Sequence, residues 1–329
     1  MNPLIDSYIQ YVSSIRRYSP RTQAVYRDVL EEYAAYSLDA PDDPDGLAAS
    51  LVPTSLRNYE VHLLEDRKLG SRTVNLHLSV LSGFCRYLMT QGRLKSNPVR
   101  LVTRPKTEKR LPEFYRDDAM EKYFSETAHA ASEDELELLR SLDPQAEPLA
   151  RTLYERRLRR LVVSLLHASG LRRAELASLD VRSLDRQRNI LTVKGKGDKM
   201  REVPLIPQVV GEVGLYLQAA EAFFGGAPAA GDPLLRTPSG RRLYPVYIDR
   251  AVKTELGSVP DITGRKSPHV LRHTLATGLL NEGSDLNSIK ELLGHSSLAA
   301  TQVYTHNSVE KLKSVYEKAH PRAKDPSDT

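Results

Sequence analysis

Apolar residues recur at helical spacing through the first ninety or so positions of the chain. The clearest stripe comprises Leu4, Ile5, Tyr8, Ile9, Val12 and Ile15. Ser19 followed by Pro20 is typical of a helix start, because serine caps free N–H groups and proline lacks one. We expect a polar loop at 41–45, a helix over about 54–70, and a last helix capped by Ser71. The pattern therefore predicts a four-helix, all-α unit.

The pattern changes after this unit. Prolines at 98, 105 and 112 stop helices in a basic stretch, which we interpret as a linker. Residues 116–168 are predicted to be mainly helical, and two β-prone runs at 189–194 and 201–205 around a glycine-rich turn predict a hairpin. A helix near 208–223 and further helices from Pro268 complete the prediction.

We therefore predict a mainly α protein with a small β component. The expected domains are an all-α four-helix domain, a linker, a mixed α+β domain and a short tail, over residues 1–92, 93–109, 110–318 and 319–329. A length of 329 residues is sufficient for two domains. The single cysteine, Cys85, excludes an internal disulfide and a cysteine-based zinc site. No apolar run is long enough to span a membrane and no signal peptide is recognised, so we expect a cytoplasmic protein without a membrane partner.

Charge is unevenly distributed along the chain. Residues 93–110 contain seven basic residues and one acidic residue, and residues 151–201 contain fourteen basic and five acidic residues. Between them, residues 113–149 contain eleven acidic and three basic residues. We interpret 126–149 as an acidic insertion of unassigned role. Concentrated positive charge could follow a phosphate backbone, but for a charge run taken alone the pattern favours a solvated charged surface.

Several polar residues lie where an element begins or ends. Arg172 follows a helix stop and precedes Glu175 at a new helix start, an arrangement that suits either a bound phosphate or a surface salt bridge. Lys196 lies between glycines at the predicted hairpin tip, outside any P-loop pattern. The basic cluster at 156–160 is either a DNA contact or one face of a helix.

The last third of the chain adds a second group of such residues. His269 and Arg272 lie three apart on a helix that begins at Pro268, so both can bind one oxyanion. His273 makes a metal-binding pair with His269 conceivable, but no HExxH pattern is present. His295 follows a helix-ending glycine, and Tyr304 comes nine residues later.

Taken in order, these motifs resemble those of the tyrosine recombinase family, in its Xer-type subgroup. The resemblance covers nearly the whole chain, and residues 1–92 are similar to the family's core-binding domain. It implies these catalytic residues: Arg172, Lys196, His269, Arg272, His295 and the nucleophile Tyr304. It implies a supporting role for Glu175. It also implies DNA contacts from Arg72, Asn75, Arg104, Lys106 and Lys199.

The resemblance implies a reaction as well. A recombinase of this kind cuts and rejoins DNA through a 3′-phosphotyrosyl bond and a Holliday junction, without a metal or cofactor. The implied partners are a double-stranded recombination site and three further subunits, either copies of this chain or a paralogous recombinase. An apolar stripe between Val309 and Ala319 would either pack on its own domain or, as the resemblance implies and we favour, dock on a neighbouring subunit. A DNA translocase is allowed as an activator.

The expected biological role is Xer-like resolution of chromosome dimers at cell division. Three alternatives stay open: the integrase of a mobile element, a type IB topoisomerase, and a non-catalytic DNA-binding protein.

Overall fold

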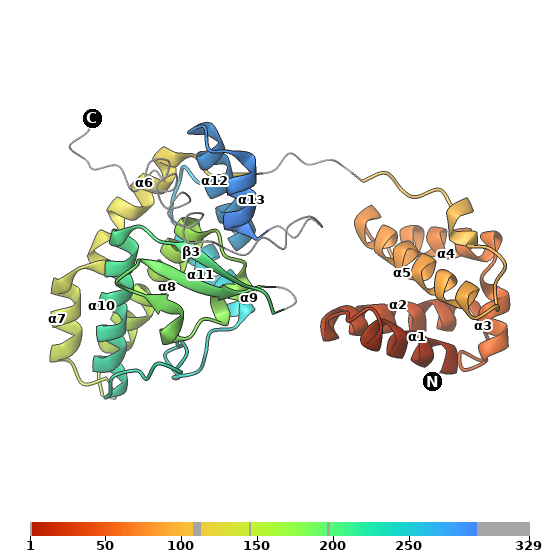
Figure 1. Cartoon of the computed structure of the whole chain (residues 1–329), viewed down its shortest axis with the longest axis horizontal. Coiled ribbons are helices and arrows are strands. Elements are labelled where there is room, and N and C mark those ends of the chain that lie inside the picture. Colours follow the sequence, from red (N-terminus) through yellow and green to blue (C-terminus); the bar gives the residue numbers. More distant parts are fainter. Residues whose placement is uncertain (1, 108–112, 145, 196–197, 295–329) are drawn as a thin grey trace. The chain divides into compact units, whose positions relative to one another are not determined.

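The computed structural model describes residues 2–107, 113–144, 146–195 and 198–294. The chain divides into two compact units, residues 1–110 and 111–329, each with its own cluster of buried hydrophobic residues (Figure 1). Within the described ranges, every helix is too short or too polar to cross a membrane.

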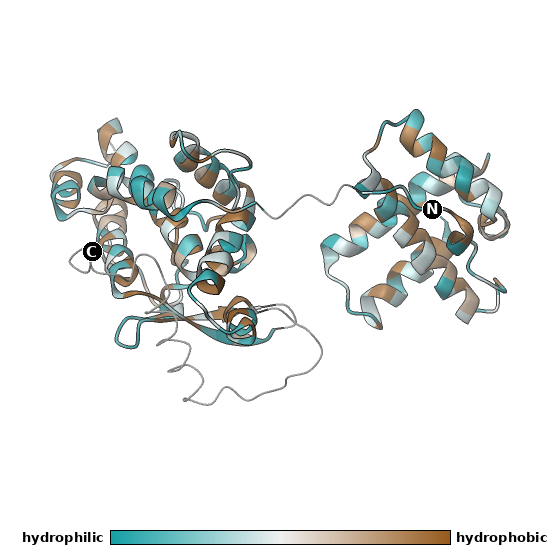
Figure 2. Cartoon of the chain, turned by 90° about the horizontal axis from the view of Figure 1, so that it is seen from above, coloured by the Kyte–Doolittle hydropathy of each residue, from teal (hydrophilic) through white to brown (hydrophobic). Residues whose placement is uncertain are grey.

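The described part of the first unit is entirely helical. Its elements are α1 (Pro3–Ser14), α2 (Pro20–Ser37), α3 (Pro44–Ser50), α4 (Pro53–Glu65), α5 (Ser71–Thr90) and the 3₁₀ helix η1 (Pro98–Leu101). Hydrophobic and hydrophilic residues share these helices, as Figure 2 shows. Proline begins each of α1 to α4, and side chains of Asn2, Ser19 and Asp43 cap the first three.

The all-α prediction for this unit is confirmed, with two corrections. The short helix α3 begins at Pro44, inside the loop expected at 41–45, and was missed because seven residues are too few to display a helical period. Gly70, and not Ser71, is the N-cap residue of α5.

The described part of the basic segment after α5 packs on the first unit. Val99 and Val102 are buried in its core. Asn97 donates to the hydroxyl and the carbonyl of Ser82, at 2.9 and 3.2 Å. Asn75 on α5 donates to the carbonyl of Pro105 at 2.9 Å. Up to residue 107, this segment is therefore a folded edge of the unit.

The second unit is mixed, as predicted. Its helices are α6 (Asp117–Glu126), α7 (Glu133–Ser141), α8 (Pro148–Ser169), α9 (Arg173–Ala177), α10 (Pro207–Phe224), α11 (Pro245–Gly257), α12 (Pro268–Asn281) and α13 (Leu286–Leu293), with 3₁₀ turns η2 (Ala128–Ala131) and η3 (Val181–Ser183). Its strands are β1 (Leu184–Asp185), β2 (Ile190–Lys194) and β3 (Met200–Pro204). They form an antiparallel sheet in the order β1-β2-β3, with Leu191 opposite Val203. The predicted hairpin is confirmed.

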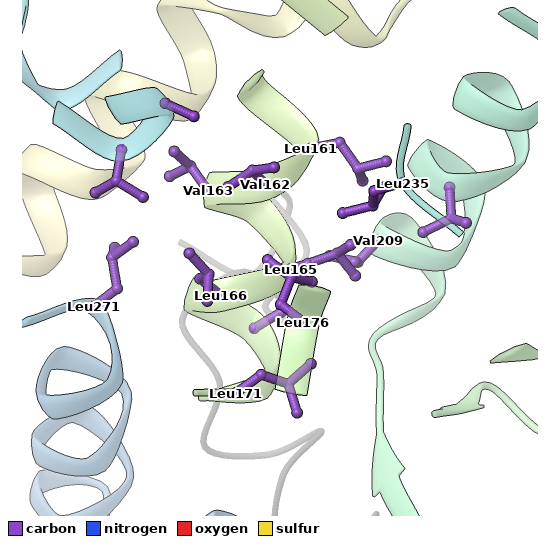
Figure 3. Packing of buried hydrophobic residues seen from close by; sticks show 14 of the residues in the cluster. Leu161, Val162, Val163, Leu165, Leu166, Leu171, Leu176, Val209, Leu235 and Leu271 are labelled. Atoms are coloured by element: carbon purple, nitrogen blue, oxygen red, sulfur yellow. The ribbon is translucent and has the colours of Figure 1, made fainter. Parts of the chain in front are cut away.

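Helix α8 is the centre of the second unit, and α10, α11 and α12 pack against it. Figure 3 shows its leucines and valines pointing to both sides, towards Leu271 of α12 on one and towards Val209 and Leu235 on the other. Leu165 and Leu166 are fully buried. A helix that is buried on most sides is held firmly, so the turn at its C-terminal end has a fixed position.

The expected acidic insertion is part of this packing. Leu136 and Leu139 of α7 are buried in the core, and the helix contacts α8 and α10. Glu135 of α7 pairs with Arg156 of α8 at 2.6 Å.

The basic cluster of α8 is bonded within the unit. Arg160 pairs with Glu212 at 2.8 Å, and both side chains are buried. Arg159 pairs with Glu255 at 3.0 Å. Arg157 donates to the carbonyl of Ser132 at 2.7 Å. Of the two interpretations of this cluster, the structure therefore supports helix packing over DNA contact.

Candidate active site

Three segments of the second unit meet at the turn that follows α8. The turn contains Gly170 and Arg172, the second segment is the start of α12, and the third is the C-terminal end of α13. Arg172 donates to the carbonyl of Gly294 at 3.1 Å. Arg272 of α12 donates to the carbonyls of Gly170 and Leu293, both at 2.5 Å. The predicted arginines are thus brought together although they are distant in sequence.

Gly170 ends α8 in the left-handed conformation, at φ 59°. A Cβ atom here would lie 2.6 Å from Cδ2 of Leu293 and 3.0 Å from Cδ2 of Leu275. Only glycine combines this backbone with such close neighbours. The turn can therefore lie directly against α12 and α13.

The two arginines donate to neighbouring carbonyls at the C-terminal end of α13: Arg272 to that of Leu293 and Arg172 to that of Gly294. Arg272 is buried, and burial together with the charge of Arg172 lowers its pKa to about 10. It is therefore still protonated at neutral pH. Two fixed cations side by side can bind the non-bridging oxygens of one phosphate.

Glu175 holds Arg172 in place at the start of α9. Its carboxylate accepts the backbone N–H of Arg172 at 2.9 Å and the guanidinium of Arg172 at 2.8 Å. The salt bridge considered from the sequence is therefore present. It fixes the arginine, whose side chain is still 38% exposed and open to a ligand.

Arg201 of β3 is a site residue that sequence reasoning missed. It donates to both carboxylate oxygens of Glu175, at 3.0 and 2.9 Å, and to the carbonyl of Leu292 at 3.3 Å. Its guanidinium lies against Gly294: a Cβ atom added to this glycine would be 3.1 Å from the guanidinium. The available signal was strand alternation, because Arg201 shares the buried face of β3 with Val203, and a buried charge needs a partner.

The carboxylate of Glu175 is ionised in spite of its burial. Burial raises its pKa, but hydrogen bonds from Arg201 and from the N–H of Arg172 lower it to about 2. Three guanidinium groups and one carboxylate leave two net positive charges around the turn. This balance suits a singly charged phosphodiester group whose non-bridging oxygens gain a second negative charge in the transition state.

His269 lies exposed on the first turn of α12. Its pKa is lowered, first by desolvation and then by the positive charges of Arg173 and Arg265. The imidazole is therefore neutral at pH 7 and able to accept a proton.

The remaining predicted catalytic residues, Lys196, His295 and Tyr304, lie outside the described residues, as does the predicted tail helix. The residues just before two of them border the site. A Cβ atom on Gly195 would lie 3.5 Å from Nη1 of Arg201, and Gly294 contacts Arg172 and Arg201.

The predicted DNA-contacting residues differ in their surroundings. Arg72, Lys106 and Lys199 are exposed. Arg104 is exposed as well and donates to the hydroxyl of Ser79 at 2.9 Å. Asn75 is half-buried, and its side-chain amide already donates a hydrogen bond to the carbonyl of Pro105 within the unit.

Comparison with known proteins identifies both units. Residues 145–311 match the Phage integrase family, and residues 5–92 match the N-terminal SAM-like domain of phage integrases. The chain is 32% identical over 325 residues to the tyrosine recombinase XerC of Chlorobaculum parvum, covering 97% of this chain and 94% of the relative. It is 34% identical over 331 residues to the tyrosine recombinase XerC of Pelobacter propionicus, covering 99% of each.

A solved structure shares the fold. A lambda integrase tetramer bound to a Holliday junction matches with a TM-score of 0.60 at 17% identity, covering 92% of this chain and 79% of that chain.

Proposed function

The chain belongs to the phage integrase family and is a Xer-type tyrosine recombinase, and we propose that it performs DNA strand exchange at the site around Arg172 and Arg272. The observation that supports this location is the seating of both guanidinium groups on adjacent carbonyls at the end of α13. Phosphoryl transfer depends mainly on positioning and on stabilising charge, which two fixed cations supply.

The proposed chemistry is a pair of transesterifications. The phenolic oxygen of Tyr304 attacks the phosphorus of a DNA phosphodiester, so that a 3′-phosphotyrosyl bond forms and the bond to the 5′ oxygen breaks. The 5′-hydroxyl of another strand then attacks the phosphotyrosine and releases the tyrosine. Bond energy is retained, so no ATP is consumed. Arg172 and Arg272 neutralise the extra charge on the non-bridging oxygens, which is the task a metal ion would otherwise perform.

Proton transfers need further groups. A phenol with an ordinary pKa near ~10 must lose its proton to attack, and His269 is neutral at pH 7 and so can take it. By family resemblance, Lys196 protonates the leaving 5′ oxygen and His295 hydrogen-bonds the phosphate.

We assign residues 1–92 to core DNA binding, 93–109 to the connection, 110–318 to catalysis and 319–329 to a tail. The match of residues 5–92 to the SAM-like domain supports the first assignment. The exposed cations Arg72, Arg104 and Lys106 suit contact with phosphates. Lys199 would add a contact from the β2–β3 hairpin.

We further propose that four subunits assemble on two recombination sites, because a fold neighbour is a tetramer on a Holliday junction. XerC relatives that match almost the whole chain favour chromosome dimer resolution in the cytoplasm over a mobile-element role. A DNA translocase is the proposed activator.

A nicked suicide substrate tests the chemistry. The binding site is first found by selecting genomic DNA fragments that the protein retains. A nick placed beside the cleavage position in this DNA then traps the covalent complex. The full chain should form an adduct that survives SDS and EDTA. Tyr304→Phe should bind the same duplex without forming the adduct. An adduct from that variant would exclude Tyr304 as the nucleophile, and no adduct from the unmodified chain on bound DNA would exclude the activity.

A further inference from the structure

The segment just before α6 is bonded to the loop that leads into α12. Tyr115 and Glu113 lie about 150 positions before residues 264–267, yet their side chains hydrogen-bond the backbone of that loop. Lys122 of α6 adds an ion pair to Asp261 at 2.8 Å. Two segments that are remote in sequence are therefore held together at several points.

Tyr115 makes two hydrogen bonds to this loop and a third to α12 itself. Its hydroxyl donates to the carbonyl of Arg265 at 2.8 Å and accepts the N–H of Ser267 at 3.2 Å. Its backbone N–H donates to Oγ1 of Thr274 at 2.9 Å, in the second turn of α12. The anchored positions 267 and 274 flank His269 and Arg272 in the sequence. One residue thus holds the chain on both sides of the catalytic pair.

Glu113 holds the same loop from its N-terminal side. Its carboxylate accepts the N–H of Arg265 at 2.9 Å. Gly264 has φ 77°, and a Cβ atom there would lie 3.1 Å from Oε2 of Glu113. The carboxylate therefore lies directly against the turn of the loop.

The hydroxyl of Tyr115 does what an apolar side chain could not. The residue is only 4% exposed, so leucine or phenylalanine would also fill the space. Within the described ranges, however, no helix or strand backbone pairs with the Arg265 carbonyl or the Ser267 N–H, and such groups need hydrogen bonds when they are removed from water. Burial raises the pKa of the phenol to about 12, so the hydroxyl stays protonated and can both donate and accept.

The start of α12 depends on this loop. Among the described residues, no side chain caps the N-terminus of the helix. His269 is exposed on that first turn, so its position follows from where the loop places the backbone. Arg272, by contrast, has its own bonds to Gly170 and Leu293.

We propose that Tyr115 is a positioning residue of the active site, which fixes the loop before α12 and so places the His269 imidazole for proton transfer. This inference rests on the function proposed above. A misplacement of about 1 Å at a reacting group costs as much as ~100-fold in rate. Loss of the hydroxyl alone, with the ring retained, should therefore slow catalysis without weakening DNA binding.

The test compares Tyr115→Phe with Tyr123→Phe in the full chain. Tyr123 is a similarly buried tyrosine of the same unit, and its hydroxyl donates to Glu255 of α11 at 3.0 Å instead of to the backbone of residues 264–267. Single-turnover adduct formation on the nicked substrate should fall about 10-fold in Tyr115→Phe. In Tyr123→Phe it should be unchanged, and DNA affinity should stay within about 2-fold in both. Equal rates in the two variants would overturn the proposal.

A second measurement reports on the loop without activity. Hydrogen exchange in a peptide spanning 262–272 should be faster in Tyr115→Phe than in Tyr123→Phe, because the Ser267 N–H loses its acceptor. If Tyr115→Phe does not fold, Glu113→Ala takes its place, because this exposed side chain bonds the same loop. If the unmodified chain forms no adduct, the proposed function fails, and unchanged exchange would then overturn the positioning role separately.

Discussion

Arg201 and Glu175 form a bidentate ion pair in the interior of the second unit, in which Nη1 and Nη2 of the arginine donate to the two carboxylate oxygens at 3.0 and 2.9 Å. Neither residue would touch DNA directly. The pair instead joins β3 to the start of α9, where Arg172 lies. It therefore determines whether Arg172, the first of the two proposed catalytic arginines, is correctly placed.

Removing one partner of this pair should be costly. In Arg201→Ala, the buried carboxylate of Glu175 loses two hydrogen bonds and a neighbouring positive charge. We therefore expect a loss of about 3 kcal/mol in the free energy of unfolding. Urea unfolding followed by circular dichroism measures it. Arg188→Ala is the control at the same sheet, because Arg188 lies between β1 and β2 and its pair with Glu202 of β3 is partly exposed, with side chains 44% and 31% accessible, and contributes about 0–1 kcal/mol. Equal losses in the two variants would contradict the structural role of Arg201.

The ionisation of Glu175 should make stability depend on pH. Its pKa is lowered from 4.5 to about 2 in the folded chain, so the folded state favours the charged form. The stabilisation is complete above pH 4.5 and is lost as the pH falls towards 2. A shift of this size corresponds to roughly 3 kcal/mol.

Glu175→Gln isolates this contribution. The stability difference between the unmodified chain and the variant should be largest near pH 7 and should shrink below pH 4.5, as measured by urea midpoints at each pH. A difference that stays constant from pH 7 down to pH 2.5 would show that folding does not lower the pKa of this carboxylate.

Protonation of His269 should determine how the cleavage rate falls on the acidic side of its pH profile. Its pKa is lowered by desolvation and neighbouring cations, so the base is neutral at pH 7 and becomes protonated only below its ordinary range. Single-turnover adduct formation should therefore hold steady down to about pH 6.5 and decline below it. DNA binding at each pH is the control. An identical decline in His269→Gln would assign the limb to another group.

Gly170 should tolerate no side chain. In Gly170→Ala the methyl group meets Leu293 at 2.6 Å, with the backbone at φ 59°. We expect a loss of about 1–3 kcal/mol in the free energy of unfolding, and slower cleavage because Arg272 bonds the Gly170 carbonyl. Gly211→Ala is the control, since that glycine lies in α10 with no atom near its added methyl group, and should gain up to about 1 kcal/mol.

Much of this architecture was predictable because it depends on local pattern. Proline and cap residues mark the starts of α1 and α2, and the glycine-rich turn marks the β2–β3 hairpin. Arg172, Glu175 and Arg272 were found from ordered motifs, and the structure brings them together. Lys196, His295 and Tyr304 stay predictions.

What sequence reasoning missed depends on pairing across long separations. The counted charges of α8 gave no sign that Arg160 would meet Glu212, or that Arg156 would meet Glu135. The bond between Tyr115 and Arg265 likewise joins residues 150 positions apart. The net charge of a sequence segment treats every charged residue as if it faced solvent. In the folded chain, many of these residues form ion pairs with residues of other segments.

The pairing of the α8 arginines bears on the thermodynamics of DNA binding. Each phosphate neutralised by a protein cation releases condensed counterions, which gives a slope of about −0.9 per contact in a plot of log affinity against log salt. Arg156, Arg159 and Arg160 already have carboxylates as partners and contribute nothing to that release. The slope of log affinity against log salt should therefore reflect only the exposed cations. It should be shallower than the fourteen basic residues of 151–201 suggest.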